Sequence, residues 1–213
     1  MRGKFITFEG PEGSGKTTHA GHLVERLKAG GRDIVYAREP GGTPTGEAIR
    51  KILQYDQAGE PICRETEVLL FAASRAQLVR HVILPALERG ADVVCDRFAD
   101  STTAYQGYGR GFPIDQMLAI NQFAIDGAEP DLTILLDLDV GAGFDRLARR
   151  HRETSSTWDR IEREEKAFHE SVRKGYLELA RRWPGRFRVI DASRGVEAVD
   201  EDVWRVVQDV IRR

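Results

Sequence analysis

The sequence has few cysteines and little excess charge. Its 213 residues include only two cysteines, Cys63 and Cys95, which lie far apart and match no metal-ligand spacing. A disulfide framework would need more of them, so we expect a reducing, cytoplasmic setting. The 32 basic residues nearly balance the 34 acidic ones. This balance argues against a protein that coats nucleic acid or an anionic membrane, and any polyanion it binds should be small.

Long apolar runs are missing as well. No run approaches the roughly 20 residues that a helix needs to cross a bilayer. The first residues, MRGKFITFEG, lack the apolar stretch of a signal peptide. We therefore expect neither secretion nor membrane insertion. No repeat and no Pro/Gly/Ser linker marks a second domain, so residues 1–213 are predicted to form one domain.

Short apolar runs rich in β-branched residues alternate with longer segments that have helical spacing. Each run is interpreted as a strand buried on both faces, and the runs are residues 5–8, 34–36, 93–95, 133–138 and 187–190. Strands that alternate with helices need crossover connections, and these build a parallel sheet covered on both faces. The pattern predicts an α/β fold, a three-layer sandwich around a five-stranded parallel sheet.

A glycine-rich segment follows the first expected strand. Residues 10–17, GPEGSGKT, match the pattern G-x-x-x-x-G-K-S/T without a mismatch. Such a loop aims backbone N–H groups at phosphate oxygens, and the next helix adds its positive end. Lys16 would neutralise the β and γ oxygens, and Thr17 would offer its hydroxyl to Mg²⁺. The predicted ATP site comprises Gly10, Pro11, Glu12, Gly13, Ser14, Gly15, Lys16, Thr17 and Thr18.

Other classes of phosphate-binding loop protein fit less well. A GTP switch would carry the guanine-reading tetrad N-K-x-D, which the region around the fourth strand lacks. Motor and transporter ATPases need more chain for their transmission elements. These comparisons leave a compact enzyme that moves the γ-phosphoryl group to a small acceptor.

Seven segments, spread over nearly the whole chain, carry a more specific resemblance. They are FEGPEGSGKTTH, AREPGGTP, LLFAASRAQL, DRFADSTTAYQGYGRG, PDLTILLDLD, DRIE and VIDA. In this order they resemble segments of bacterial thymidylate kinases, members of the nucleoside monophosphate kinase group. The resemblance implies phosphorylation of dTMP to dTDP with ATP and Mg²⁺, in dTTP biosynthesis. It also implies the strand order 2-3-1-4-5, a mobile lid at about residues 146–160 and a homodimer.

The resemblance also implies a dTMP site near the ends of the second and third strands. Phe71 would stack on thymine, and Arg75, four residues on and on the same helix face, would hydrogen-bond its carbonyl edge. Tyr105 is the candidate that excludes a ribose 2′-hydroxyl. The remaining residues assigned to this site are Glu39, Pro40, Ser101, Thr102 and Gln106.

Charged residues are expected where the two phosphates meet. Two polyanions approach each other only if fixed cations lie between them, and Arg97 is well placed for this role, with Asp96 near the magnesium. By resemblance, Glu12 points away from the loop and meets the deoxyribose 3′-hydroxyl. The acceptor phosphate is largely a dianion at neutral pH, so no general base is needed.

The phosphate-binding loop contains no arginine, so a further cation must come from elsewhere. Arg149, Arg150 and Arg152 lie just before DRIE, where bacterial members of the family place lid arginines. One of the three is predicted to be catalytic, and the sequence does not decide which. Asp191, after the last strand, corresponds to the loop that abuts adenine in related kinases.

Two alternatives stay open at this stage. The first is a kinase of another nucleoside monophosphate or of a nucleoside, because the base-reading residues are inferred by resemblance. The second is a nucleotide-binding regulatory module that transfers nothing. Arg97, Glu12 and the basic lid disfavour the module, because a mere binder needs no second cluster of cations facing an acceptor.

Overall fold

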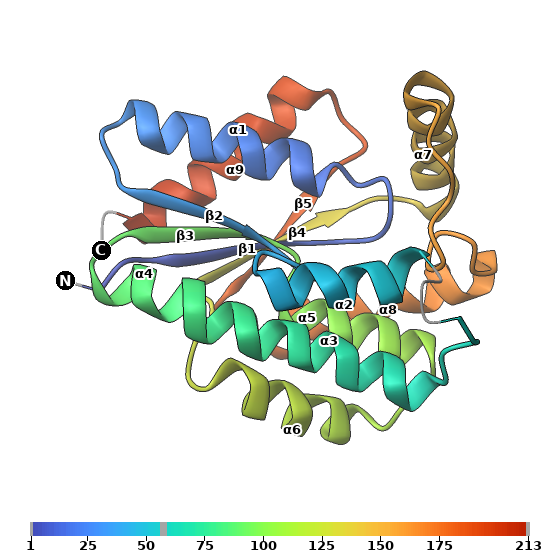
Figure 1. The fold of residues 1–213 in the computed structure, drawn as a ribbon. Coiled ribbons are helices and arrows are strands. Elements are labelled where there is room, and N and C mark those ends of the chain that lie inside the picture. Colours follow the sequence, from blue (N-terminus) through green and yellow to red (C-terminus); the bar gives the residue numbers. More distant parts are fainter. Residues whose placement is uncertain (1, 56–58, 212–213) are drawn as a thin grey trace.

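A five-stranded parallel sheet forms the centre of the computed structural model, which describes residues 2–55 and 59–211 (Figure 1). The strands are β1 (Phe5–Glu9), β2 (Ile34–Arg38), β3 (Asp92–Asp96), β4 (Leu132–Asp137) and β5 (Phe187–Asp191). Their order is β2-β3-β1-β4-β5, and every neighbouring pair is parallel. The predicted fold class and strand order are confirmed.

Helices cover both faces of the sheet, as crossover connections require. On one face lie α1 (Lys16–Ala29) and α9 (Val196–Ile211), and α7 (Val140–Thr154) stands apart beside the end of the sheet (Figure 1). The other face carries α2 (Pro44–Tyr55), α3 (Arg64–Leu78), the π-helical turn η1 (Val79–Ile83), α4 (Leu84–Glu88), α5 (Ala99–Thr102), the π-helical segment η2 (Thr103–Gly109), α6 (Ile114–Ile125) and α8 (Lys166–Arg182).

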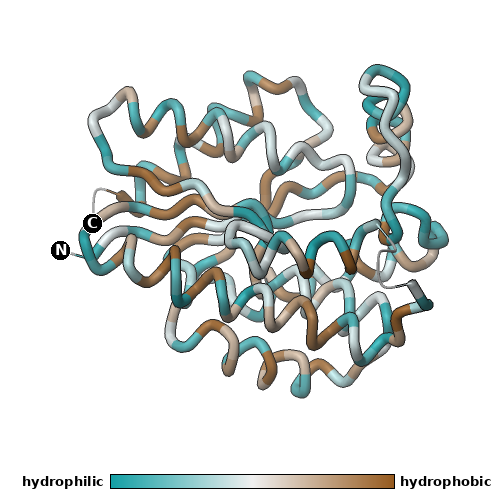
Figure 2. Tube along the Cα trace, in the orientation of Figure 1, coloured by the Kyte–Doolittle hydropathy of each residue, from teal (hydrophilic) through white to brown (hydrophobic). Residues whose placement is uncertain are grey.

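Two apolar layers hold these helices on the sheet, because successive strand residues point to opposite faces. In β1, Ile6 and Phe8 pack with Leu23 of α1 and Val203 of α9. Phe5, on the other face, packs among the residues of η1 and α4. The brown strands in Figure 2 mark this apolar centre, whereas the tip of α7 is teal.

The two edge strands differ from the prediction that every strand is buried on both faces. Tyr36 in β2 is 41% exposed and Val189 in β5 is 50% exposed. Their apolar runs look the same in sequence as those of central strands. An edge strand has a neighbour on one side only, so part of its surface stays in contact with water.

One helical passage is more apolar than the sequence analysis recognised. Arg64–Glu88, which comprises α3, η1 and α4, is long and apolar enough to cross a membrane by length and composition. Its 18-residue apolar window has a mean hydropathy of 1.2, and 39% of that window is buried. Leu78, Val79 and Ile83 pack beneath β3, and Arg75 is buried within the fold. Part of this passage therefore packs in the core of the domain, and part of it, such as Leu69, is exposed.

Candidate active site

The loop between β1 and α1 has the backbone that a phosphate cradle requires. Gly13 has a φ of +72°, and a Cβ placed there would lie 2.3 Å from the carbonyl oxygen of Gly143. A side chain at this position would push α7 away from the loop. Gly15, at φ +89°, ends the loop, and α1 begins at Lys16. The predicted strand, loop and helix are therefore present in the predicted order.

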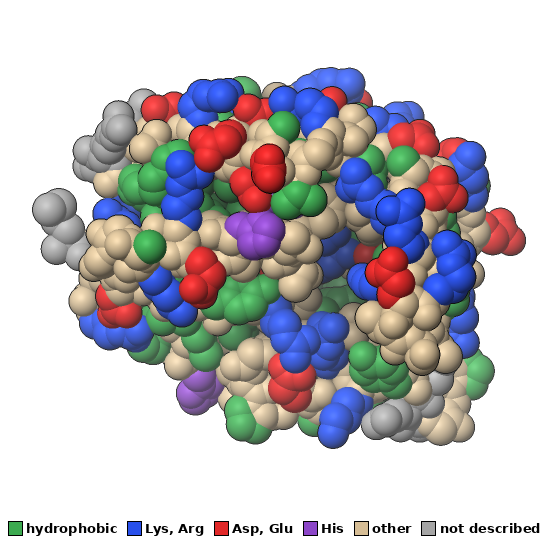
Figure 3. Space-filling view, turned by 90° about the horizontal axis from the view of Figure 1, so that it is seen from above, with side chains coloured by type: hydrophobic (Ala, Val, Ile, Leu, Met, Phe, Trp, Pro, Cys, Tyr) green, Lys and Arg blue, Asp and Glu red, His purple; other side chains and the backbone are tan. Residues whose placement is uncertain are grey.

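A cleft of about 1290 Å³ opens beside this loop, at the carboxyl ends of the strands. Open α/β sheets bind ligands at this edge. Lys and Arg side chains, blue in Figure 3, gather around the hollow. The predicted residues that line the cleft are Glu12, Gly13, Gly15, Lys16, Thr17, Thr18, Glu39, Pro40, Phe71, Asp96, Arg97, Ser101, Thr102, Tyr105, Gln106, Arg149 and Arg150.

Six predicted residues do not line the cleft. Gly10, Pro11 and Ser14 are buried within the loop and shape it from beneath. Asp191 is exposed and accepts a hydrogen bond from the backbone N–H of Ser193, so it caps its own turn. The neighbouring residues that do line the cleft are Ala192, Arg194, Gly195 and Val196. The other two exceptions are Arg75, on α3, and Arg152, on α7.

Lys16 lies inside the curve of the loop. Its ammonium donates to the carbonyl oxygens of Gly10, at 3.0 Å, and Pro11, at 2.7 Å. Burial and the nearby guanidinium of Arg97 lower the pKa of Lys16 to about 8. Lys16 is therefore still largely protonated at pH 7, and two positive charges face the same part of the cleft.

Arg97, Glu12 and Tyr105 form one hydrogen-bonded group. Arg97 has a φ of +68°, a left-handed conformation that is uncommon outside glycine and is often found at functional sites. Its Nη2 donates to Glu12 Oε1 at 2.5 Å, and the Tyr105 hydroxyl donates to the same oxygen at 2.8 Å. Burial opposes ionisation of Glu12, but Arg97 and Lys16 outweigh it and hold the Glu12 pKa at about 2. Glu12 is therefore a carboxylate that faces Arg97.

Thr17 and Asp96 provide oxygen ligands next to each other. The Thr17 hydroxyl donates to Asp96 Oδ2, which brings the first turn of α1 to the end of β3. Hydroxyl and carboxylate oxygens are the ligands that Mg²⁺ prefers, together with water and phosphate oxygens. The chemistry of this pair therefore fits a magnesium ion.

Arg75 lies behind the cleft surface. Its side chain is 1% exposed and donates to Glu39 Oε2 at 2.9 Å, Asn121 Oδ1 at 2.8 Å and Thr102 Oγ1 at 2.8 Å. Phe71 and Arg75 do share a helix face, but buried acceptors hold the guanidinium beneath the lining. Arg75 does not line the cleft, and its predicted contact with thymine stays a prediction.

Glu39 lines the cleft and has one buried carboxyl oxygen without a partner among the described residues. Its Oε2 accepts from Arg75, whereas its buried Oε1 has no hydrogen-bond partner among the described residues. Burial raises the pKa of Glu39 to about 7, against the opposing effect of Arg75. At neutral pH the side chain is thus divided between a form that donates a hydrogen bond and a form that only accepts one.

The sequence analysis missed an acidic residue beneath the site. Glu9 ends β1, is fully buried, and accepts hydrogen bonds from the Ser101 hydroxyl at 2.6 Å and the Tyr176 hydroxyl at 3.0 Å. Burial and the neighbouring charge of Asp100 raise the pKa of Glu9 to about 7. A lone acidic residue in an apolar strand, just before the phosphate-binding loop, was the available signal.

The structure of α7 shows which of the predicted lid arginines line the cleft. Arg149 and Arg150 line the cleft, whereas Arg152 lies outside it. The missed Arg146 lines the cleft too and donates to the carbonyl oxygen of Ala192 at 2.9 Å. Positions 146, 149 and 150 have the i, i+3, i+4 spacing of one helix face, which excludes 152. If this polar stretch had been predicted as a helix, its spacing would have grouped Arg146, Arg149 and Arg150 on one face and left Arg152 off it.

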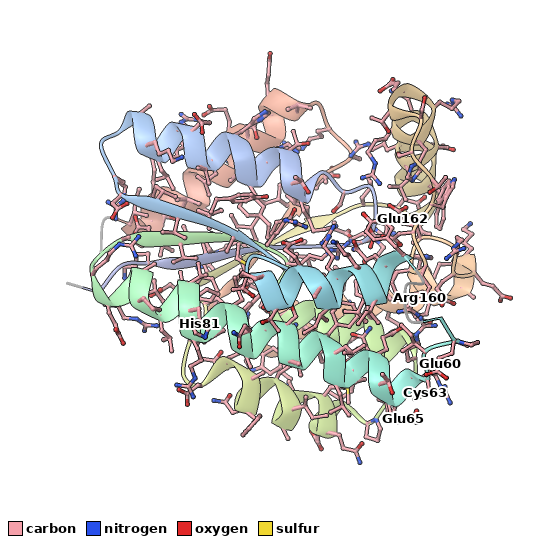
Figure 4. The ribbon with its side chains drawn as sticks, viewed as in Figure 1. Glu60, Cys63, Glu65, His81, Arg160 and Glu162 are labelled. Carbon is pink, nitrogen blue, oxygen red and sulfur yellow. The ribbon has the colours of Figure 1, made fainter. Side chains whose placement is uncertain are left out.

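Arg149 and Arg150 differ in their partners. Arg150 Nη2 donates to Glu162 Oε1 at 2.7 Å, and Glu162 lies below α7 in Figure 4. Arg149 is exposed and makes no hydrogen bond or ion pair with the residues that the structure describes. Arg149 is therefore the predicted arginine whose charge is both unpaired and at the cleft.

Another cleft cation comes from α2. Arg50 lines the cleft and donates to the carbonyl oxygen of Pro40 at 2.9 Å. It lies in a helix with several polar residues, so nothing in the local sequence distinguishes it from a solvated side chain.

Comparisons with known proteins agree over nearly the whole chain. The family model described as "Thymidylate kinase" matches residues 8–203. The thymidylate kinase of Pelotomaculum thermopropionicum is 51% identical over 211 residues, which span 99% of this chain and 95% of that protein. The thymidylate kinase of Deinococcus radiodurans is 47% identical over 208 residues, 98% of each protein. The crystal structure of the thymidylate kinase from Ehrlichia chaffeensis has a TM-score of 0.76 at 33% identity, covering 97% of this chain and 99% of that one.

Proposed function

The chain belongs to the thymidylate kinase family, and from this premise we propose how its residues carry out the reaction. The protein is a phosphotransferase that moves the γ-phosphoryl group of ATP to dTMP, giving ADP and dTDP. One observation carries the residue assignments. A single cleft joins the phosphate-binding loop to Phe71 and Glu39, and Arg97 is bonded to the loop within it.

The donor end holds ATP by its phosphates. Backbone N–H groups of the loop and the N-terminus of α1 surround the β-phosphate, and Lys16 neutralises the γ-phosphoryl oxygens. Arg194 and Gly195 line the cleft, and we assign them to the adenine. Thr17 and Asp96 would hold Mg²⁺, which supplies further charge neutralisation to the phosphates when bound.

The acceptor end reads the base by stacking and by one hydrogen bond. Phe71 offers its ring to thymine, and we assign the polar edge of the base to Glu39, whose Oε1 has no partner among the described residues. In its protonated form Glu39 donates to a carbonyl oxygen, while Arg75 fixes the other carboxyl oxygen from behind.

Tyr105 crowds the sugar. We expect the Tyr105→Ala variant to discriminate less between dTMP and ribothymidine monophosphate, as measured by kcat/KM for each. If the ratio of these two kcat/KM values equals that of the wild type, Tyr105 does not exclude the ribose 2′-hydroxyl.

The transfer itself needs charge neutralisation and positioning. The dTMP phosphate attacks as a dianion, so neither a general base nor a covalent enzyme intermediate is required. Lys16 and Arg97 meet the charge that the two phosphates bring together. Arg149 approaches when the lid, residues 146–160, closes over the cleft and excludes water.

The Phe71→Ala variant tests the acceptor end. We expect KM for dTMP to rise roughly 5- to 150-fold, because base stacking is worth about 1–3 kcal/mol. KM for ATP should stay within about twofold, since Phe71 lies away from the donor end. Steady-state kinetics with each substrate varied in turn measures both values. An equal loss for ATP and dTMP would mean that Phe71 supports the fold instead.

Two further assignments belong to this proposal. The protein works as a homodimer through α3 and α6, which pack side by side and expose Leu69 (61%) and Phe123 (88%). It acts in the cytoplasm, where thiols such as Cys63 stay reduced. A monomeric mass by light scattering would refute the dimer. ADP release that does not require dTMP would refute the kinase and favour an ATPase, whereas no ADP release with any acceptor would favour a binding module.

A further inference from the structure

Two histidines of α1 and an aspartate of α9 meet where these two helices pack together. His19 Nδ1 lies 2.6 Å from Asp200 Oδ1, and His22 Nδ1 lies 2.7 Å from Asp200 Oδ2. All three side chains bring a ligand atom within 4.8 Å of one another. Histidine and acidic side chains lie next to each other on this face of the molecule in Figure 3.

The two helices hold this cluster rigidly. His19 and His22 are three residues apart, so they share one face of α1. That pair of helices is locked by packing of Leu23 with Val203, and the Arg26 guanidinium lies 4.3 Å from the ring centre of Trp204. Ligands carried by packed helices keep their geometry better than ligands on loops.

Burial changes steadily across the cluster. The side chain of His19 is 6% exposed, that of Asp200 is 24% exposed and that of His22 is 52% exposed. One side of the cluster therefore faces the protein and the other faces water. An ion can enter from the solvent and complete its coordination with water molecules.

We propose that His19, His22 and Asp200 form a binding site for a divalent transition-metal ion, with Zn²⁺ as the best match. Two imidazole nitrogens and one carboxylate oxygen are a typical ligand set for zinc, whereas Mg²⁺ prefers oxygen ligands. The ion takes the place of the protons that now lie between the imidazoles and the carboxylate. Each histidine then binds through Nδ1 and carries its proton on Nε2.

This site is separate from the expected magnesium ligands but touches the same loop. A Cβ placed on Gly15 would lie 3.2 Å from His19 Nε2, so the His19 ring lies against the end of the phosphate-binding loop. The proposed ion would join α1 to α9, which follows directly on Arg194 and Gly195 in the cleft wall. Its direct effect is to tie together the two helices that flank the donor end.

The test uses the full-length protein, stripped of metal with a chelator and kept free of nucleotide. Zn²⁺ is titrated by calorimetry, and Co²⁺ serves as a spectroscopic probe of nitrogen and oxygen coordination. We expect one ion per chain and a higher melting temperature with Zn²⁺. Binding should weaken at least roughly tenfold in His22→Ala and in Asp200→Asn.

The matched control is His81→Ala, which removes an exposed histidine of η1 far from this site (Figure 4). It should bind Zn²⁺ like the wild type. Circular dichroism of the stripped variants checks that each is folded. Absence of binding to the wild type would overturn the proposal. Equal binding by the wild type, His22→Ala and Asp200→Asn would overturn it too, leaving the cluster as a hydrogen-bonded contact between helices.

Discussion

Replacing Lys16 with alanine is expected to lower kcat roughly 1,000-fold or more, which is the scale on which a single cation aimed at the γ-phosphoryl group acts. Lys16 is the ammonium held inside the phosphate-binding loop, 2.7 Å from the carbonyl oxygen of Pro11. No other side chain in the loop is cationic, so the variant has nothing there to replace it. A coupled assay of ADP release at saturating ATP and dTMP measures kcat.

The control for this variant is Lys28→Ala, which removes an exposed lysine from the last turn of the same helix. Its kcat should stay close to that of the wild type. Melting temperatures of both variants show whether the loss comes from chemistry or from unfolding. A folded Lys16→Ala enzyme with near-normal kcat would refute the donor site assigned here.

The second large effect is expected at Arg149. Its charge is unpaired among the described residues and lines the cleft, so the Arg149→Ala variant should lose roughly 1,000-fold in kcat, on the scale of an arginine finger. KM for both substrates should change little, because the lid arginine acts on the transition state. Single-variant kinetics at saturating ATP and dTMP measures the loss.

Arg150→Ala and Arg152→Ala are the matched controls on the same helix. Arg150 is paired with Glu162, and Arg152 lies outside the cleft, so both variants should keep most of the activity. A large loss in Arg150→Ala alone would transfer the catalytic role to that residue. Small losses in all three variants would mean that Lys16 and Arg97 neutralise the charge without the lid.

The fold was predictable because its sequence pattern and its topology agree. Strands that alternate with helices are expected to pair in parallel. The loop at residues 10–17 also indicates a strand directly before it and a helix directly after it. The extent of burial at the sheet edges was not predictable. Tyr36 and Val189 are exposed because β2 and β5 end the sheet, and strand order in space came from the family resemblance, since the local sequence does not show it.

The sequence motifs and the helix spacing were enough to predict many of the residues that line the site. Lys16, Arg97 and Phe71 all line the cleft, as the sequence indicated. Arg75 shares the helix face of Phe71, but its burial depends on Glu39, a residue 36 positions away. Arg50 was missed for a similar reason, because its contact with the Pro40 carbonyl joins a helix to a loop. Contacts of this kind join residues that are distant in the sequence, so the local sequence pattern does not predict them.

The most direct test of the whole account is the kcat/KM of the wild-type enzyme for a panel of acceptors. ADP release from ATP is followed with dTMP, dUMP, dCMP, AMP, GMP and thymidine, each at several concentrations. The account predicts that turnover requires an acceptor and that dTMP gives the highest kcat/KM. A higher value for another monophosphate or for the nucleoside would contradict the assigned acceptor, and no turnover with any of them would contradict phosphoryl transfer itself.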